Sequence, residues 1–401
     1  MKSGWTRKNL GDLCQVIGGG TPSKDKAKYY SGDIPWATVR DMRSEVITET
    51  ECKITREAVK CSATNIIPSG NVVIATRVGL GKVCLLGQDT AINQDLRGIV
   101  PIDLKVLSVR FLFWWLKGIA DSIVAEGTGA TVQGVKLPFV KSLQAPVPPL
   151  PEQQRIVGIL DEAFGGLATA TANAEKNLHN ARALFESHLQ SVFTQRGKGW
   201  TEKPLSELCD IKHGFAFKSE FFASEGDYVL LTPGNFYETG GYRDRGEKQK
   251  YYTGEIPRDY VLGTGDLLVA MTEQAAGLLG SPILIPESDK FLHNQRLGLV
   301  TKKQGVPWTN DFFFHVFNTQ AVRKEIHDSA SGVKVRHTSP TKIGEVVVSF
   351  PNSISEQHAI VSTLKDLHEE TQRLEFLYQQ KLAALEALKK SLLHQAFTEE
   401  L

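Results

Sequence analysis

The sequence predicts an α/β (α+β) protein in which two similar mixed α/β domains are separated by a long antiparallel two-helix coiled coil. Two observations predict this class. A stretch of about 200 residues occurs twice with its motifs in the same order, and each copy ends in a long run without proline, beginning near Glu152 and near Glu356. A duplication of this kind implies pseudo-twofold internal symmetry.

The repeat extends over most of the chain. Gly4-Trp5-Thr6 corresponds to Gly199-Trp200-Thr201, and Ile92-Asn93-Gln94 corresponds to His293-Asn294-Gln295. Short apolar runs bounded by Gly, Pro or Asn predict strands at 71–76, 98–101 and 346–350. Apolar residues at helical spacing predict packed helices over 106–120 and 311–327. The expected domains are 1–147, 148–197, 198–351 and 352–401, in which the second and fourth are the long helices.

Each long run carries a stripe of residues at alternating spacings of four and three, which predicts one contact face along a helix. The first stripe is rich in alanine where the second has Leu and Tyr, so we expect the two helices to pack against each other, antiparallel. Asn177 and Lys381 are expected to fix their register. The predicted faces are Ile156, Leu160, Ala163, Leu167, Ala170, Ala174, Asn177, Ala181, Leu184 and His188, and Ile360, Leu364, Leu367, Thr371, Leu374, Tyr378, Lys381, Leu385, Leu388 and Leu392.

The composition is that of a soluble globular protein, with 41% hydrophobic and 23% charged residues over 401 positions. A chain of this length is expected to form two or more domains. It has neither a membrane-spanning apolar stretch nor a secretory signal. Its five scattered cysteines favour free thiols in a reducing cytoplasm over a zinc site. A net charge of +1 neither suggests nor excludes nucleic acid.

Motifs of common enzyme classes are missing. The glycines at 18–20 lack dinucleotide-fingerprint spacing, and 79–82 lacks the upstream glycine and the following Ser or Thr of a P-loop. No HExxH, Gly-x-Ser-x-Gly or amino-methyltransferase tetrapeptide occurs. We therefore expect neither catalytic residues nor a metal site.

Loops that combine Gly with basic and amide side chains recur in both halves. Arg and Lys commonly bind guanine, Asn and Gln bind adenine, and Gly lets backbone N–H groups approach phosphates. Each residue alone is equally well explained as a solvated surface charge, but a framework that repeats while its loops diverge suits two readers of different DNA sequences. The candidate DNA-binding residues are Arg40, Arg43, Arg77, Lys82, Gln94, Arg97, Thr128 and Lys136 in the first half, and Asn235, Arg243, Arg245, Thr272, Gln295, Arg296, Lys334 and Arg336 in the second.

Several duplicated motifs follow one order through the chain: tandem Gly-Trp starts, a Gly-Gly-Gly-Thr-Pro loop at 18–22, Asn-Gln pairs at 93–94 and 294–295, Gly-Thr-Gly and Ser-Gly stretches at 127–129 and 331–332, and proline-bordered entries into Glu-Gln-x-x-Ile helices at 152 and 356. Over its whole length the chain thereby resembles the specificity (S) subunits of type I restriction-modification enzymes, the HsdS family.

The resemblance implies two target recognition domains, each reading one half of a split DNA sequence, and a helix pair that sets the gap between the halves. It implies two methyltransferase (M) subunits that use S-adenosylmethionine to methylate adenine, and restriction (R) subunits that use ATP and Mg. This chain would bind no cofactor, would not be an enzyme and would be cytoplasmic. The implied partner-binding or spacer residues are Glu152, Gln153, Ile156, Leu160, Leu167, Leu184, Glu356, Gln357, Ile360, Leu364, Leu374, Tyr378 and Leu385.

Two alternatives stay open at this point. The chain could be a protein scaffold that binds no DNA, which its near-neutral charge favours slightly. It could also be an S-like subunit of a type II restriction enzyme, which would differ only in its partners.

Overall fold

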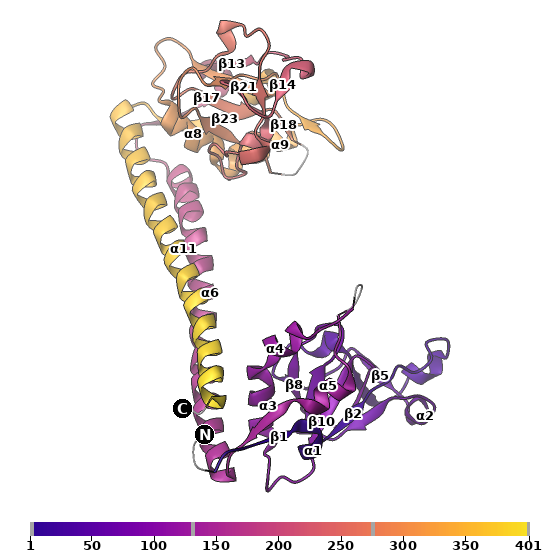
Figure 1. Cartoon of the computed structure of the whole chain (residues 1–401). Helices are drawn as coiled ribbons and strands as arrows, with labels where there is room; N and C mark the ends of the chain where they lie inside the picture. Colours follow the sequence, from indigo (N-terminus) through magenta and orange to yellow (C-terminus); the bar gives the residue numbers. More distant parts are fainter. Residues whose placement is uncertain (1–3, 130–132, 274–276, 399–401) are drawn as a thin grey trace. The chain divides into compact units, whose positions relative to one another are not determined.

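The chain folds into two compact units, seen in a computed structural model (Figure 1). The structure describes residues 4–129, 133–273 and 277–398. Residues 1–176 with 379–401 form the first unit, and residues 177–378 form the second. Two long helices each contribute one stretch to each unit. Each unit therefore contains a globular part, called here the first or second globule, and a pair of helix segments.

The first globule is built on a five-stranded sheet in the order β2-β10-β7-β8-β4. The neighbours are antiparallel except for β4 and β8, which run parallel. The central strand β7 is a continuous apolar run, and all of its residues are buried, as expected for a strand covered on both faces. The strands are β2 (Cys14–Gly18), β10 (Leu96–Pro101), β7 (Val72–Ala75), β8 (Val83–Leu86) and β4 (Val46–Ile47).

A second sheet and a two-stranded ribbon complete the strands of this globule. The sheet has the order β5-β3-β9-β6, and the ribbon joins β1 to β11. Short helices α1, α2 and α5 connect them. Their bounds are β5 (Cys52–Ile54), β3 (Ile34–Ala37), β9 (Thr90–Ile92), β6 (Asn65–Ile67), β1 (Thr6–Asn9), β11 (Gln144–Val147), α1 (Leu10–Leu13), α2 (Arg56–Lys60) and α5 (Leu137–Ser142).

The second globule repeats this topology. The order β13-β21-β17-β19 answers β2-β10-β7-β8, β16-β15-β20 answers β5-β3-β9, and the β12–β23 ribbon answers β1–β11. A bridge from Val261 to Leu292 takes the place of β6, and β14 is an added edge strand. Even the parallel pairing of β3 with β9 recurs in β15 with β20. The predicted duplication is therefore confirmed in three dimensions. The strands are β12 (Trp200–Pro204), β13 (Cys209–His213), β14 (Phe222–Ala223), β15 (Val229–Leu230), β16 (Tyr251–Tyr252), β17 (Leu267–Ala270), β18 (Thr272–Glu273), β19 (Pro282–Leu284), β20 (Phe291–Leu292), β21 (Leu297–Lys302), β22 (Arg336–His337) and β23 (Val347–Pro351).

A buried aromatic helix packs on the main sheet of each globule. In the first it is α3, in which residues 111–116 are all buried and the Ser108 hydroxyl caps the start. The sequence predicts one helix over 106–120 and one over 311–327, but each is two helices that meet at Ile119 and at Thr319. The helices are α3 (Val109–Gly118), α4 (Ala120–Ala125), α8 (Asn310–Asn318), α9 (Gln320–Asp328), α7 (Leu205–Leu208) and α10 (Pro340–Gly344).

The two long helices are α6 (Leu150–Gln195) and α11 (Ile354–Phe397). In the first unit the beginning of α6 and the end of α11 share one core, which contains Leu160 and Phe397. In the second unit the end of α6 lies with the beginning of α11, where Arg182 pairs with Glu375 at 3.1 Å. Within each unit the two segments are therefore antiparallel, as predicted. No helix in the described ranges is long and apolar enough to cross a membrane.

Most of the predicted contact face is correct, and four of its positions are wrong. Leu160, Leu167 and Leu364 are buried, and so are Ala174, Ala181 and Thr371 nearer the middle of the helices. Asn177 and Lys381 are exposed, so neither can fix register from inside the face. Leu184 and Leu388 are also exposed. The neighbouring positions Leu178, Phe185 and Leu382 are half-buried in their place. The contact face therefore departs from the strict heptad by one residue at these positions, because about 3.6 residues per turn do not match a repeat of about 3.5.

All five cysteines are free, and three of them are buried. Burial raises the pKa of the thiols of Cys14 and Cys209 to about 12. It also raises the pKa of Cys84 to about 11. These three thiols therefore stay protonated and act as small core residues.

Candidate nucleic-acid interface

The candidate residues of the first unit lie in loops that meet at one edge of the main sheet. The loop after β7 connects to the loop before β10 because the Thr76 N–H donates to the Asp95 carbonyl at 2.8 Å. The same loop connects to the segment before α5 because the Val135 N–H donates to the Thr76 carbonyl at 2.9 Å. Residues distant in sequence are thus held in one cluster, which we call the first loop cluster.

Polar side chains converge within this cluster. The Arg77 guanidinium lies 3.7 Å from the Asp95 carboxylate. Arg97 donates to the backbone carbonyl of Gln94 at 3.0 Å, and the Gln94 side chain accepts a hydrogen bond from the Thr21 hydroxyl. Burial lowers the pKa of Arg97, and the nearby Arg77 lowers it further, against the opposing effect of Asp95. Two guanidiniums, an amide and a hydroxyl, groups of the kind that bind base edges, are therefore positioned together.

The other candidates of the first unit surround this centre and are exposed. Arg43 pairs with Glu51, and Lys82 reaches the Met42 carbonyl at 3.5 Å. Arg40, Thr128 and Lys136 are exposed as well. The predicted loop 127–136 includes residues 130–132, which lie outside the described residues.

The second unit builds its cluster with the same two backbone hydrogen bonds. The Met271 N–H donates to the Arg296 carbonyl at 3.0 Å, and the Thr338 N–H donates to the Met271 carbonyl at 3.0 Å. We call this set the second loop cluster. Gln295 and Arg296 are exposed there. The frame is conserved between the units, whereas the side chains that it presents differ. Arg243 and Lys334 are exposed, and Arg245 and Arg336 are half-buried.

Two candidates of the second unit are buried, and the prediction that they contact DNA is corrected here. Asn235 is 1% exposed, and its amide donates to the Gln249 side chain at 2.9 Å while its oxygen accepts from the Thr232 backbone at 3.0 Å. Thr272 is 7% exposed and bonds the His337 ring at 3.2 Å. Both side chains hold loops in place. The first unit has the same Thr-x-x-Asx capping box at Thr38 and Asp41, a sequence pattern that identifies the structural role.

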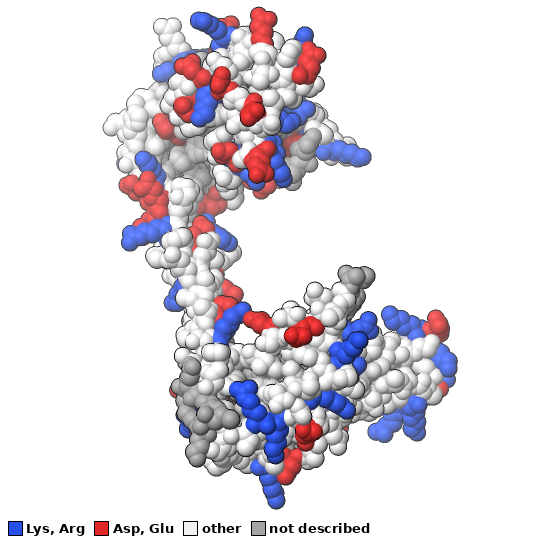
Figure 2. Space-filling view, in the orientation of Figure 1, with Lys and Arg blue, Asp and Glu red and all other residues white. Residues whose placement is uncertain are grey.

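Two features of the first globule were not predicted from the sequence. Thr21 was placed only in the Gly-Gly-Gly-Thr-Pro loop, yet its hydroxyl donates to the Gln94 side chain. Figure 2 shows Lys and Arg side chains gathered at the end of the first globule where Figure 1 labels α2 and β5. These elements contribute Lys53, Arg56 and Lys60. The spacing of positive charges in a helix and a paired strand was the available signal.

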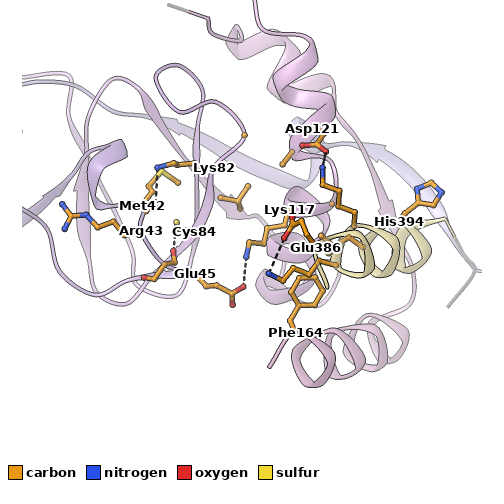
Figure 3. A pocket seen from close by; sticks show the side chains of 18 residues that line it. Met42, Arg43, Glu45, Lys82, Cys84, Lys117, Asp121, Phe164, Glu386 and His394 are labelled. Atoms are coloured by element: carbon orange, nitrogen blue, oxygen red, sulfur yellow. Dashed lines mark hydrogen bonds and ion pairs between the residues drawn. The ribbon is translucent and has the colours of Figure 1, made fainter. Parts of the chain in front are cut away.

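A cavity of about 580 Å³ lies in the first unit between the first globule and the last turns of α11 (Figure 3). Two of its lysines are paired with acids: Lys117 lies 2.6 Å from Glu45 and Lys390 lies 3.0 Å from Asp121. Arg43 and Lys82 extend from the first loop cluster to the wall of this cavity. The Lys390–Asp121 pair joins α11 to the globule beside the candidate interface.

The entry of each long helix is fixed by a buried glutamine. Gln153 accepts from the Ser108 N–H at 2.9 Å and donates to the Val106 carbonyl at 2.8 Å. Gln357 accepts from the Thr309 N–H at 3.0 Å and donates to the Pro307 carbonyl at 2.7 Å. Both were predicted as partner-binding or spacer residues, and both are buried where their helix joins the globule.

Duplicated mixed α/β units that share one helix pair define the class of protein to which this chain belongs. The chain is a member of the type I restriction modification DNA specificity domain family, whose model matches residues 2–177 and 197–387. The family membership expected from the sequence motifs is thereby confirmed.

Curated relatives support this assignment. The specificity subunit of the Escherichia coli EcoR124I/EcoR124II type I restriction enzyme is 35% identical over 194 residues, which cover 47% of this chain and 48% of that relative. The MjaIX specificity subunit of Methanocaldococcus jannaschii is 31% identical over 227 residues, 52% of each chain. The chain thus spans about half the length of these relatives. The M. jannaschii MjaVIII specificity subunit is 22% identical over 382 residues, 90% of this chain and 86% of that one.

Solved structures share the fold. A chain from a study of complex assembly and conformational transition of the type I R-M system has a TM-score of 0.78 at 18% identity, covering 100% of this chain and 99% of its own. The HsdS subunit from Thermoanaerobacter tengcongensis has a TM-score of 0.65 at 18% identity and covers 100% and 98%. The predicted fold class is confirmed.

Proposed function

We propose that this chain is the DNA-sequence specificity subunit of a type I restriction-modification complex and that each loop cluster reads one half of a bipartite target. One observation carries the proposal: the same backbone frame carries different residues at equivalent positions of the two units, Arg77 and Arg97 in one and Thr272 and Gly298 in the other. Two readers on one frame suit a target of two unlike half-sites. Because DNA is the target, we expect the chain to act in the cytoplasm.

The partners follow from the same proposal. Methyltransferase subunits would dock on the helix pair and supply S-adenosylmethionine for adenine methylation, and restriction subunits would supply ATP and Mg chemistry. Docking needs exposed groups, and α11 offers Phe376 at 59% and Leu377 at 48% exposure, apolar residues that water would otherwise surround. This chain would contribute recognition and spacing and no catalytic group.

The test is expression of the chain with its methyltransferase subunit in a host whose genome is then mapped for methyladenine. We expect one split motif with two defined halves and a fixed gap. A matched arm carries both Arg77→Ala and Arg97→Ala, which should relax one half and leave the other unchanged. Complex formation without any sequence-specific methylation or DNA binding would instead indicate a protein scaffold.

A further inference from the structure

An antiparallel bridge of the same span lies at the same place in each unit, and in the second unit it closes a small hairpin. A bridge joins Thr128 to Gly134 in the first unit, and another joins Ser331 to His337 in the second. Each residue of the second bridge therefore lies 203 positions after its counterpart in the first. Just after each bridge the chain bonds to the loop that follows the central strand, through Val135 and Thr338. Residues at the tips, by contrast, differ between the two copies.

The second hairpin is held firmly at its base. Ser331 and His337 exchange both backbone hydrogen bonds, at 3.0 and 2.8 Å. Gly332 has a φ of +100°, and a Cβ there would collide with the Val335 carbonyl, so glycine is required. The Arg336 guanidinium donates to the His327 carbonyl at 2.6 Å. A short loop with these restraints presents its tip in a defined position.

The tip combines an apolar side chain with positive charge. Val333 is 100% exposed, and the exposed Lys334 follows it. No acidic residue occurs from 329 to 344. The carboxylate of Glu273, on the strand paired with Arg336, accepts the backbone N–H groups of residues 277–279. A fully exposed valine beside a cation suits DNA as a partner. The phosphates of DNA can pair with the lysine, and the thymine methyl group offers an apolar contact to the valine.

We propose that Val333 is a specificity-determining residue that contacts the C5-methyl group of one thymine in the second half-site, while Lys334 contacts a neighbouring phosphate. The proposal rests on the function proposed above and adds to it a base class and a residue. The hydrogen bonds where the hairpin begins and ends fix the position of its tip, and the side chain at the tip selects the nucleotide.

The test uses the complete complex with its methyltransferase subunit and duplexes in which each thymine of the second half-site is replaced in turn by deoxyuridine, which lacks only the methyl group. The wild-type complex should lose about fivefold in affinity at one position. Val333→Ala should lose a similar factor on thymine DNA and nothing further on the deoxyuridine duplex. Val347→Ala serves as a control, because Val347 is an exposed valine, 52% accessible, on β23 of the same unit.

The outcomes separate the two proposals. If the wild-type complex binds DNA specifically but Val333→Ala loses the same affinity on thymine and deoxyuridine duplexes at every position, the role of Val333 is overturned. The specificity function would then remain intact. Loss of methyltransferase co-purification in Val333→Ala, with DNA contacts unchanged, would assign the tip to a protein partner and overturn it as well. Absence of specific binding by the wild-type complex would remove both proposals. Because the Val333 side chain is fully exposed, its truncation should leave folding unchanged.

Discussion

Gln153 and Gln357 occupy equivalent positions in the two units, and each is 0% exposed. Each binds the backbone N–H of the residue that precedes the buried aromatic helix of its globule, Ser108 before α3 and Thr309 before α8. Each also donates to the carbonyl of a proline just before its own helix, at 2.9 and 3.1 Å. One amide therefore joins three chain segments and sets the angle at which the long helix leaves the globule.

Replacing either glutamine by alanine should destabilise its unit by about 2–4 kcal/mol, because a buried N–H and two buried carbonyls lose their partners. The free energy of unfolding from denaturant titration measures this loss. Gln154→Ala and His358→Ala are matched controls, since both neighbours are exposed. Equal stability of Gln153→Ala and Gln154→Ala would show that the amide contacts contribute nothing net.

The second unit should be less stable at acid pH. Burial lowers the pKa of His293 and of His315 to about 4, in each case assisted by nearby positive groups, Lys212 and His213 for the first and His368 for the second. A histidine in the unfolded chain titrates near pH 6.5. Below that pH the unfolded chain therefore binds protons at these two histidines, whereas the folded unit does not until the pH nears 4. The contribution of these two neutral histidines to the free energy of unfolding is complete above about pH 6.5, falls as the pH drops toward 4, and then levels off.

This loss amounts to roughly 1.4 kcal/mol per pH unit for each histidine within the window. Hydrogen exchange of the second unit between pH 6.5 and 4.5 follows it. His293→Ile introduces the residue found at the equivalent position, Ile92, and should halve the pH slope. A slope that His293→Ile leaves unaltered would exclude this histidine as the source.

Arg97→Ala should weaken binding to the first half-site by about 1–3 kcal/mol and relax the preference at one base pair. The reason is that its guanidinium is held by the carbonyls of Gln94 and Leu96, at 3.0 and 2.8 Å, and is already positioned before DNA arrives. Competition binding with substituted half-sites measures the effect. Arg7→Ala removes an exposed arginine of β1 outside the loop cluster. A uniform loss over all sequences would make Arg97 a phosphate contact instead.

Shortening both long helices should change the gap between half-sites and leave the bases read unchanged. Deleting seven residues from each helix, 173–179 and 377–383, removes about 10 Å of helix, which corresponds to about three base pairs of DNA at 3.4 Å each. Methyladenine mapping should show a shorter gap, or no modified motif if the shorter complex cannot engage both halves. An unaltered gap would contradict the spacer function.

Exchanging 198–350 for the equivalent segment of a relative with another specificity should alter one half-site only. The β12–β23 ribbon closes this segment on itself, so the graft preserves its own frame. Methylome comparison before and after the exchange is the measurement. Changes in both half-sites would mean that the two loop clusters do not act independently.

The repeat could be predicted from the sequence because strand and helix signals recur in one order, and the buried strand β7 is a plain apolar run. The role of Gln153 could not, because its partners Val106 and Ser108 meet it only through tertiary structure. Asn235 was misassigned because an amide reads bases or caps a turn with the same atoms. The contact face was misplaced at Asn177, where the neighbouring Leu178 is half-buried instead, because about 3.6 residues per turn do not match a strict heptad.

The packing of Phe397 against Phe111, with ring centroids 5.4 Å apart, has a consequence for biosynthesis. The core of the first unit includes residues from the final turn of α11, whereas the second unit is one continuous segment, 177–378. During translation the second unit can complete its core first, while the first waits until Phe397 has been made. A ribosome that stops between residues 378 and 397 therefore leaves the first unit, whose synthesis began earlier, without a complete core.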